Sequence, residues 1–185
     1  MELTADTVDA LAYEYADDNP FATVEAEHLE IMPATLARGD YGWRDLEWVV
    51  QWYYRRRLDY DNAARRRREA AFGDNEYEDV HDAIDDAVAA DETGAKLEAL
   101  TALSGVDVSV ATAFLQFLDP DRYLVLSDRE WAALQACGEL EEPYPEEPSP
   151  AAYERYLETC RDVVGRCDCN LQTLYRALWQ VETSE

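Results

Sequence analysis

The stretch that decides the fold runs from Leu100 to Trp131 and reads LTALSGVDVSVATAFLQFLDPDRYLVLSDREW. Apolar residues recur at helical spacing before Gly105 and again after it, so the pattern predicts two helices joined by a very short turn. Glycine at such a turn permits backbone angles and close approaches that other residues resist. An Asp-Pro loop follows, and Ser127 with Asp128 predicts the start of a further helix. We therefore expect a tight helical hairpin at Gly105.

The rest of the chain predicts helices as well. Apolar periodicity and helix start and stop signals place further helices at about 4–18, 23–37, 40–54, 60–72, 77–90, 127–137, 149–164 and 170–182. No window alternates apolar and polar residues with β-branched enrichment, so no strand is expected. The segment 139–150, ELEEPYPEEPSP, contains four prolines and predicts an extended surface connection. The expected fold is all-α, with nine to ten helices in two lobes.

Length and hydropathy favour one domain over residues 1–185. The chain has no run of 18 uncharged apolar residues, so we expect no membrane span. The first residues, MELTADTVDA, lack the basic start and apolar run of a signal peptide. These features favour a cytoplasmic protein, and they leave its oligomeric state open.

The charge is strongly acidic, at −25, and Lys96 is the single lysine beside fifteen arginines. The acidic residues are spread along well-patterned helices instead of forming a tail. This composition is typical of proteins adapted to molar salt, where the Debye length falls to about 3 Å and repulsion is screened. Net charge therefore does not exclude a nucleic-acid partner.

The helical hairpin and the helix start that follows it resemble the helix-hairpin-helix DNA base-excision glycosylases, the superfamily of endonuclease III and the adenine glycosylases. The resemblance implies a helix-hairpin-helix core at about 75–137, with residues 1–74 and 138–185 forming a second helical lobe. It also implies DNA binding, with a base flipped into a cleft between the lobes.

In that superfamily the hairpin turn is usually Gly-hydrophobic-Gly, and its backbone N–H groups bind a DNA phosphate together with the following helix N-terminus. The resemblance therefore implies DNA contacts at Gly105, Val106 and Ser109. The second glycine is replaced here by Asp107, whose carboxylate opposes a phosphate. The alternative is a turn that serves helix packing alone.

The catalytic aspartate of the superfamily starts a helix about twenty residues after the hairpin. Counting from Asp107, that position is Ser127, and Asp128 comes one residue later. Asp128 is the candidate catalytic residue; the alternative is a capping box in which Ser127 and Glu130 close the helix start. The lysine that forms a Schiff base in bifunctional members is replaced by Ser109. Any activity would thus be monofunctional, and the substitutions favour a protein without catalysis.

The cysteines have part of the spacing of an iron-sulfur site. Cys160, Cys167 and Cys169 form C-x6-C-x-C. Only the first gap matches the cluster that some endonuclease III relatives hold. We therefore expect reduced thiols, with no cofactor and no metal.

Two arginine clusters hold seven of the fifteen arginines. Their candidate nucleic-acid contacts are Arg55, Arg56, Arg65, Arg66 and Arg68. Neighbouring tyrosines at 53, 54 and 60 offer stacking faces. The alternative is salt bridging to carboxylates at helical spacing, namely Asp59, Asp61 and Glu69.

Two functions remain after this reading. The first is a divergent DNA glycosylase-like protein that binds DNA and is non-catalytic or weakly active. The second is a helical interaction protein without a nucleic-acid role, whose aromatic-rich segment 43–60 forms core and a partner-binding face. A basic, aromatic-lined cleft would favour the first, whereas burial of most arginines in carboxylate pairs would favour the second.

Overall fold

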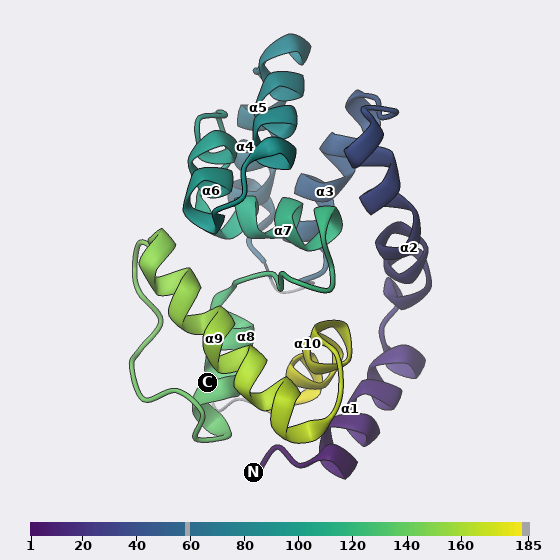
Figure 1. Ribbon diagram of the computed structural model, residues 1–185, viewed down its shortest axis with the longest axis vertical. Helices are drawn as coiled ribbons and strands as arrows, with labels where there is room; N and C mark the ends of the chain where they lie inside the picture. The colour runs from purple at the N-terminus through teal and green to yellow at the C-terminus, as the bar shows by residue number, and fades with distance from the viewer. Residues whose placement is uncertain (58–59, 183–185) are drawn as a thin grey trace.

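The computed structural model describes residues 1–57 and 60–182, and these ranges form ten helices without a strand (Figure 1). The expected all-α fold of nine to ten helices is confirmed. The helices are α1 (Ala5–Asp18), α2 (Ala22–Arg38), α3 (Trp43–Arg55), α4 (Asn62–Gly73), α5 (Tyr77–Ala89), α6 (Thr93–Thr101), α7 (Val108–Leu118), α8 (Asp128–Ala136), α9 (Pro150–Cys167) and α10 (Leu171–Gln180). None of them is long and apolar enough to cross a membrane.

Side-chain caps fix where many of these helices begin. Thr4 and Ser149 accept a hydrogen bond from a backbone N–H in the first turn of α1 and α9. Asp61 does the same for α4, which therefore begins at Asn62 instead of the expected position near 60. Gly39, in the left-handed region at φ +71°, ends α2.

The helices form two groups that share one apolar core. In Figure 1, α1, α8, α9 and α10 lie in the lower half and α2 to α7 in the upper half. Helix α1 packs mainly on α10, and α8 also packs on α10, whereas α2, α3 and α6 pack on α7. This division differs from the expected one, in which residues 75–137 formed one lobe and the flanking segments the other.

The reason for the difference is the burial of α7. Every residue from Ser109 to Phe117 is buried. A helix that is buried on all sides needs neighbours on all sides. The helices after it in the chain cannot supply them alone, so α2 and α3 join α6 around α7.

The hairpin at Gly105 forms as the sequence predicted. Gly105 lies between α6 and α7 at φ +77°, and a Cβ there would lie 2.6 Å from the backbone nitrogen of Phe72. The turn therefore rests directly on the last turn of α4, which only glycine allows. The six apolar residues expected between the hairpin helices are all buried: Leu100, Leu103, Val106, Ala111, Phe114 and Leu115.

The segment between α7 and α8 runs between the two groups of helices (Figure 1). After a turn at its start, residues 123–127 are buried, so their backbone N–H groups need partners. Thr112 Oγ1 accepts from Leu126 N at 2.8 Å, and Gln116 Oε1 accepts from Val125 N at 2.8 Å. These polar side chains of α7 thereby set the position at which α8 begins.

Candidate functional site

A hollow beside the hairpin brings together two of the predicted site residues, Ser109 and Asp128. It has a cavity volume of about 190 Å³ and lies among the starts of α7 and α8, the end of α3 and the proline-rich segment. We call it the hairpin hollow. Its lining residues are Tyr53, Tyr54, Arg57, Tyr60, Asp107, Ser109, Ser127, Asp128, Tyr144, Glu146 and Pro148.

Asp128, the candidate catalytic residue, is the first residue of α8, and its side chain is 54% exposed. Arg57 Nη1 donates a hydrogen bond to Asp128 Oδ1. A catalytic carboxylate would stabilise a cationic sugar intermediate by its negative charge. The guanidinium of Arg57 offsets that charge on Asp128. Asp128 is therefore placed at the hollow but is held in an ion pair.

Ser127 caps α8, although the predicted capping box does not form as expected. Ser127 Oγ accepts from Arg129 N at 3.3 Å, and its hydroxyl donates to Glu130 Oε2. Glu130 bonds the serine hydroxyl, whereas a capping box would use the serine backbone N–H. The physical reason is that Glu130 turns into the core to meet Arg56.

Arg56 and Glu130 form a buried ion pair under the hollow. Arg56 Nη1 lies 2.6 Å from Glu130 Oε1, and the two side chains are 1% and 0% exposed. Burial opposes the charge on Arg56, but Glu130, Tyr175 and Tyr53 together outweigh it and raise the pKa of Arg56 well above its usual value. Arg56, predicted as a nucleic-acid contact, thus lies mainly in the interior.

A second buried acid, Glu25, links the two groups of helices. Its carboxylate accepts hydrogen bonds from Tyr15 Oη at 3.1 Å, Trp52 Nε1 at 3.0 Å and Tyr175 Oη at 3.2 Å. Burial raises the pKa of Glu25, and these hydrogen bonds oppose the rise. Its donors come from α1, α3 and α10, so no local sequence pattern could reveal this cluster.

Two backbone N–H groups at the hairpin turn and the start of α7 already have partners within the protein. Val106 is buried, and its N–H donates to Leu103 O at 3.2 Å. Asp107 Oδ1 caps α7 by accepting from Val110 N at 3.0 Å, and Arg68 Nη1 lies 3.7 Å from Asp107 Oδ2. The start of α7 thus already holds a carboxylate where the resembling enzymes hold a phosphate.

Ser109 lies against the proline-rich segment. Its Oγ is 3.0 Å from the hydroxyl of Tyr144, so the extended segment covers this side of the hollow. Burial raises the pKa of Tyr144 to about 12. Tyr144 was missed by the sequence analysis because the segment that carries it has no helical pattern to predict its contacts.

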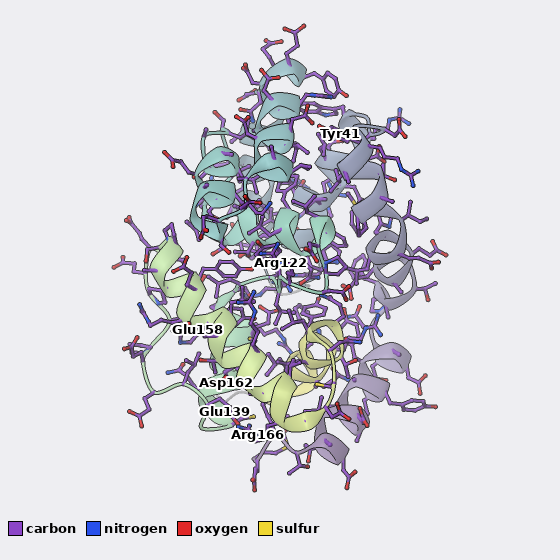
Figure 2. All side chains as sticks on the ribbon, viewed as in Figure 1. Tyr41, Arg122, Glu139, Glu158, Asp162 and Arg166 are labelled. Atoms are coloured by element: carbon purple, nitrogen blue, oxygen red, sulfur yellow. The ribbon has the colours of Figure 1, made fainter. Side chains whose placement is uncertain are left out.

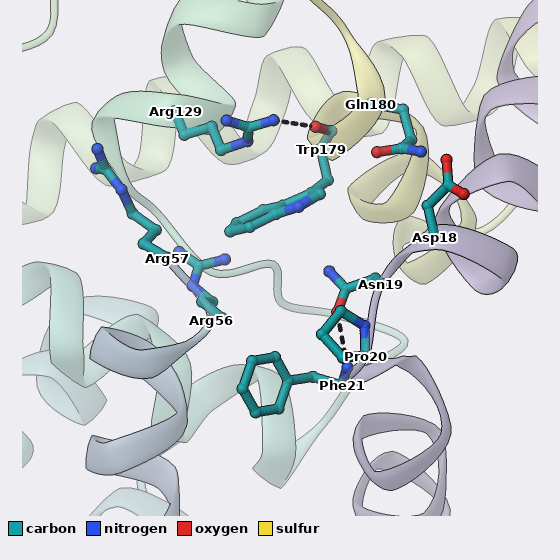
Figure 3. Close-up of a pocket in the computed structure, with 9 residues that line it drawn as sticks. All are labelled: Asp18, Asn19, Pro20, Phe21, Arg56, Arg57, Arg129, Trp179 and Gln180. Atoms are coloured by element: carbon teal, nitrogen blue, oxygen red, sulfur yellow. Dashed lines mark hydrogen bonds between the residues drawn. The ribbon is translucent and has the colours of Figure 1, made fainter. Parts of the chain in front are cut away.

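Two further hollows share Arg57 with the hairpin hollow. One is lined by Phe21, Arg55, Arg57, Tyr60, Asn62 and Arg65. The other is shown in Figure 3 and also contains Arg56, Arg129 and Trp179. We call the three hollows together the Arg57 groove. Arg66 lines none of them.

Most of the predicted arginine contacts are also ion pairs. Arg55 and Arg65 both pair with Glu69, at 2.9 and 3.0 Å, as the helical spacing of Arg65 and Glu69 predicted. Asp61 caps α4 instead, and Asp59 lies outside the described residues, as does part of the segment 43–60. At least eight of the fifteen arginines pair with a carboxylate, but only the Arg56 pair is fully buried.

The cysteines do not converge. Cys160 and Cys167 are buried in α9, whereas Cys137 and Cys169 are partly buried. Burial raises the pKa of the Cys160 thiol. Within residues 1–57 and 60–182, no group of three or more His, Cys, Asp or Glu side chains could hold a metal ion.

Comparison with protein-family models, with curated proteins and with solved structures found no match to this chain.

Proposed function

We propose that this protein binds DNA in the Arg57 groove and does not excise bases. The observation that carries the proposal is the sharing of Arg57 by three hollows whose walls contain both arginines and aromatic rings. Such a combination suits a phosphate backbone with unstacked bases. The resemblance of the hairpin to helix-hairpin-helix glycosylases supports the same kind of ligand.

The distribution of charge supports this groove as the contact surface. Five arginines and four carboxylates line its three hollows, in a chain whose net charge is −25. In molar salt long-range attraction is screened, so short contacts must supply affinity. Stacking of a base on a tyrosine contributes about 1–3 kcal/mol and needs no long-range field.

The state of the candidate catalytic groups supports binding without excision. Asp128 is paired with Arg57, and Ser109 is bonded to Tyr144. Lys96, the single lysine, is buried at the other end of the hairpin's first helix and donates to Ala87 O at 2.5 Å. No lysine is therefore placed to attack a sugar.

The second candidate function, a protein-interaction role, is favoured by the ion pairs of the arginines. Arginines that serve as partners for acidic helices need no nucleic acid. The two functions differ in one measurable respect, which is the affinity for DNA of the folded protein in molar KCl.

The test is fluorescence anisotropy in molar KCl with an undamaged duplex and with duplexes that carry a lesion or an unpaired base. We expect stronger binding to the duplexes with an unstacked base and no base release from any of them. Arg57→Gln should weaken binding about tenfold, because a bidentate donor to phosphate is lost.

The matched control is Arg166→Gln. Arg166 pairs with Glu139 (both labelled in Figure 2) and lines none of the three hollows, so its loss should leave affinity unchanged. Absence of binding to every duplex by the folded protein would contradict the proposal and favour the interaction role. Base release that disappears in Asp128→Asn would show that the catalytic part of the proposal is wrong.

We also propose that the protein works in a salt-rich cytoplasm. The support is its composition, with 41 acidic residues, one lysine and a charge of −25. Oxygen-tipped side chains surround the outline of the molecule (Figure 2).

A further inference from the structure

One hollow of the Arg57 groove shares only Arg57 with the hairpin hollow (Figure 3). Its cavity volume is about 280 Å³, and its walls come from the turn between α1 and α2, the end of α3, the start of α8 and the end of α10. We call it the Trp179 pocket. This volume is near the lower limit of about 300 Å³ for small-molecule pockets, so it suits a compact ligand group.

Arg129 is held rigidly in this pocket. Its guanidinium carbon lies 4.6 Å from the centre of the Trp179 ring, and its Nη2 donates to Trp179 O (Figure 3). Its Nε is buried and has no hydrogen-bond partner within the described residues. Because this Nε has no exposed surface, a ligand would meet Arg129 through the other atoms of the side chain that line the pocket.

Other donors surround the same space. Asn19 Oδ1 accepts from Phe21 N at 2.8 Å, which leaves the two Nδ2 hydrogens of Asn19 for a ligand. Arg57, two residues after the end of α3, also lines the pocket. Donors from three separate segments suit a tetrahedral group with several acceptor oxygens better than a flat carboxylate. The single carboxylate in the wall is Asp18.

We propose that the Trp179 pocket binds a phosphomonoester carried by a nucleotide. Arg129, Arg57 and Asn19 would hold the phosphate oxygens. Phe21 lines both this pocket and the adjoining hollow with Tyr60, so the sugar and base extend along an aromatic wall. The nucleotide is either free or the phosphorylated end of a DNA strand, and only the second source rests on the proposed function.

The test is isothermal titration calorimetry in molar KCl with matched ligand pairs. One pair is a deoxynucleoside 5′-monophosphate and its nucleoside. The second pair is an oligonucleotide with a 5′ phosphate and the same oligonucleotide with a 5′ hydroxyl. The third pair differs in the same way at the 3′ end. We expect the phosphorylated member of at least one pair to bind about tenfold more tightly, because Arg–phosphate contacts are charge-assisted.

Variants locate the discrimination. Arg129→Gln should remove it, and Arg129→Lys should weaken it, because lysine keeps the charge but loses the planar fork. Arg155→Gln is the control. Arg155 lies on α9, pairs with Glu142 and does not line the pocket. Circular dichroism checks that each variant is folded; should Arg129→Gln unfold, Arg129→Lys and Asn19→Ala carry the test.

The outcomes separate the two proposals. Discrimination for the free mononucleotide alone supports the pocket and identifies a free nucleotide as its ligand, whatever the anisotropy assay shows for DNA. Equal binding of phosphorylated and unphosphorylated members in every pair would overturn the inference while leaving DNA binding in the hairpin hollow intact. Discrimination that persists in Arg129→Gln would overturn it as well.

Discussion

At the residue scale, the interior contains two buried acids, Glu130 and Glu25, whose carboxylates have different kinds of partner. Glu130 meets a full positive charge in Arg56, whereas Glu25 meets only neutral donors from two tyrosines and a tryptophan. Burial raises the pKa of Glu25, because its partners carry no charge that would offset the cost of desolvating the carboxylate. Each difference leads to a prediction.

Glu130→Gln should lower the free energy of unfolding by about 3 kcal/mol, because it leaves the Arg56 charge buried without its partner. Chemical denaturation in molar KCl measures this. Glu139→Gln breaks the Arg166 pair, which is half-exposed on the arginine side, and should cost less than about 1 kcal/mol. Similar losses for both variants would mean that the burial of the Arg56 pair has no energetic consequence.

Glu25 predicts a pH dependence of stability. Its pKa is raised in the folded state, so the folded protein binds this proton more tightly than the unfolded chain does. The contribution of Glu25 is then fully present below the ordinary pKa of 4.5 and is lost as pH rises through the raised folded value. The free energy of unfolding, measured by denaturation from pH 4 upward, should therefore contain a decrease with pH that Glu25→Gln removes. An unchanged pH profile in this variant would contradict the assignment.

At the element scale, the helices and the hairpin could be predicted because their determinants are local. Apolar periodicity and capping residues are read within one segment, and Gly105 marks its turn directly. Ser109 and Asp128 were selected through the resemblance to helix-hairpin-helix glycosylases, and both line the hairpin hollow. Glu25, Tyr144 and the Trp179 pocket could not be predicted, because their partners are distant in sequence.

Gly105→Ala tests how the hairpin rests on α4. A Cβ would force φ +77° on an alanine and would lie 2.6 Å from Phe72 N, so the loss of stability should be about 3 kcal/mol. Gly165→Ala in α9 is the control, since nothing lies within 4 Å of its added Cβ. That substitution should be neutral or stabilise by up to about 1 kcal/mol. Equal melting temperatures of the two variants would show that the turn tolerates a side chain.

The charge at the start of α7 gives a second prediction at this scale. Asp107→Asn keeps a capping oxygen but removes the carboxylate that opposes a phosphate. If the Arg57 groove binds DNA, affinity in the anisotropy assay should rise about threefold to tenfold at unchanged stability, in line with one favourable charge change of about 1 kcal/mol. An unaltered affinity would place the DNA backbone away from this helix start.

At the scale of the whole molecule, the division into two helix groups could not be predicted from the order of elements. The resemblance of the hairpin to helix-hairpin-helix glycosylases implied that residues 75–137 form one lobe. The structure instead surrounds α7 with helices from both sides of that boundary and moves α8 to the group of α1, α9 and α10. Burial of a single apolar helix outweighs proximity in sequence, because every face of that helix must be covered.

The acid content of the molecule predicts how it responds to salt. The protein has 41 acidic and 16 basic residues, so folding brings many negative charges close together. Molar KCl screens their repulsion beyond about 3 Å, whereas dilute buffer leaves it largely unscreened. Lowering KCl from molar to millimolar concentrations should therefore reduce the melting temperature and finally the helical circular dichroism. The buried Arg56–Glu130 pair is shielded from solvent ions, so Glu130→Gln should shift the whole curve down without changing its salt dependence. Adding NaCl to the low-KCl sample should restore the fold, because screening depends on ionic strength rather than on the cation. A helical signal that persists unchanged in dilute buffer would contradict adaptation to high salt.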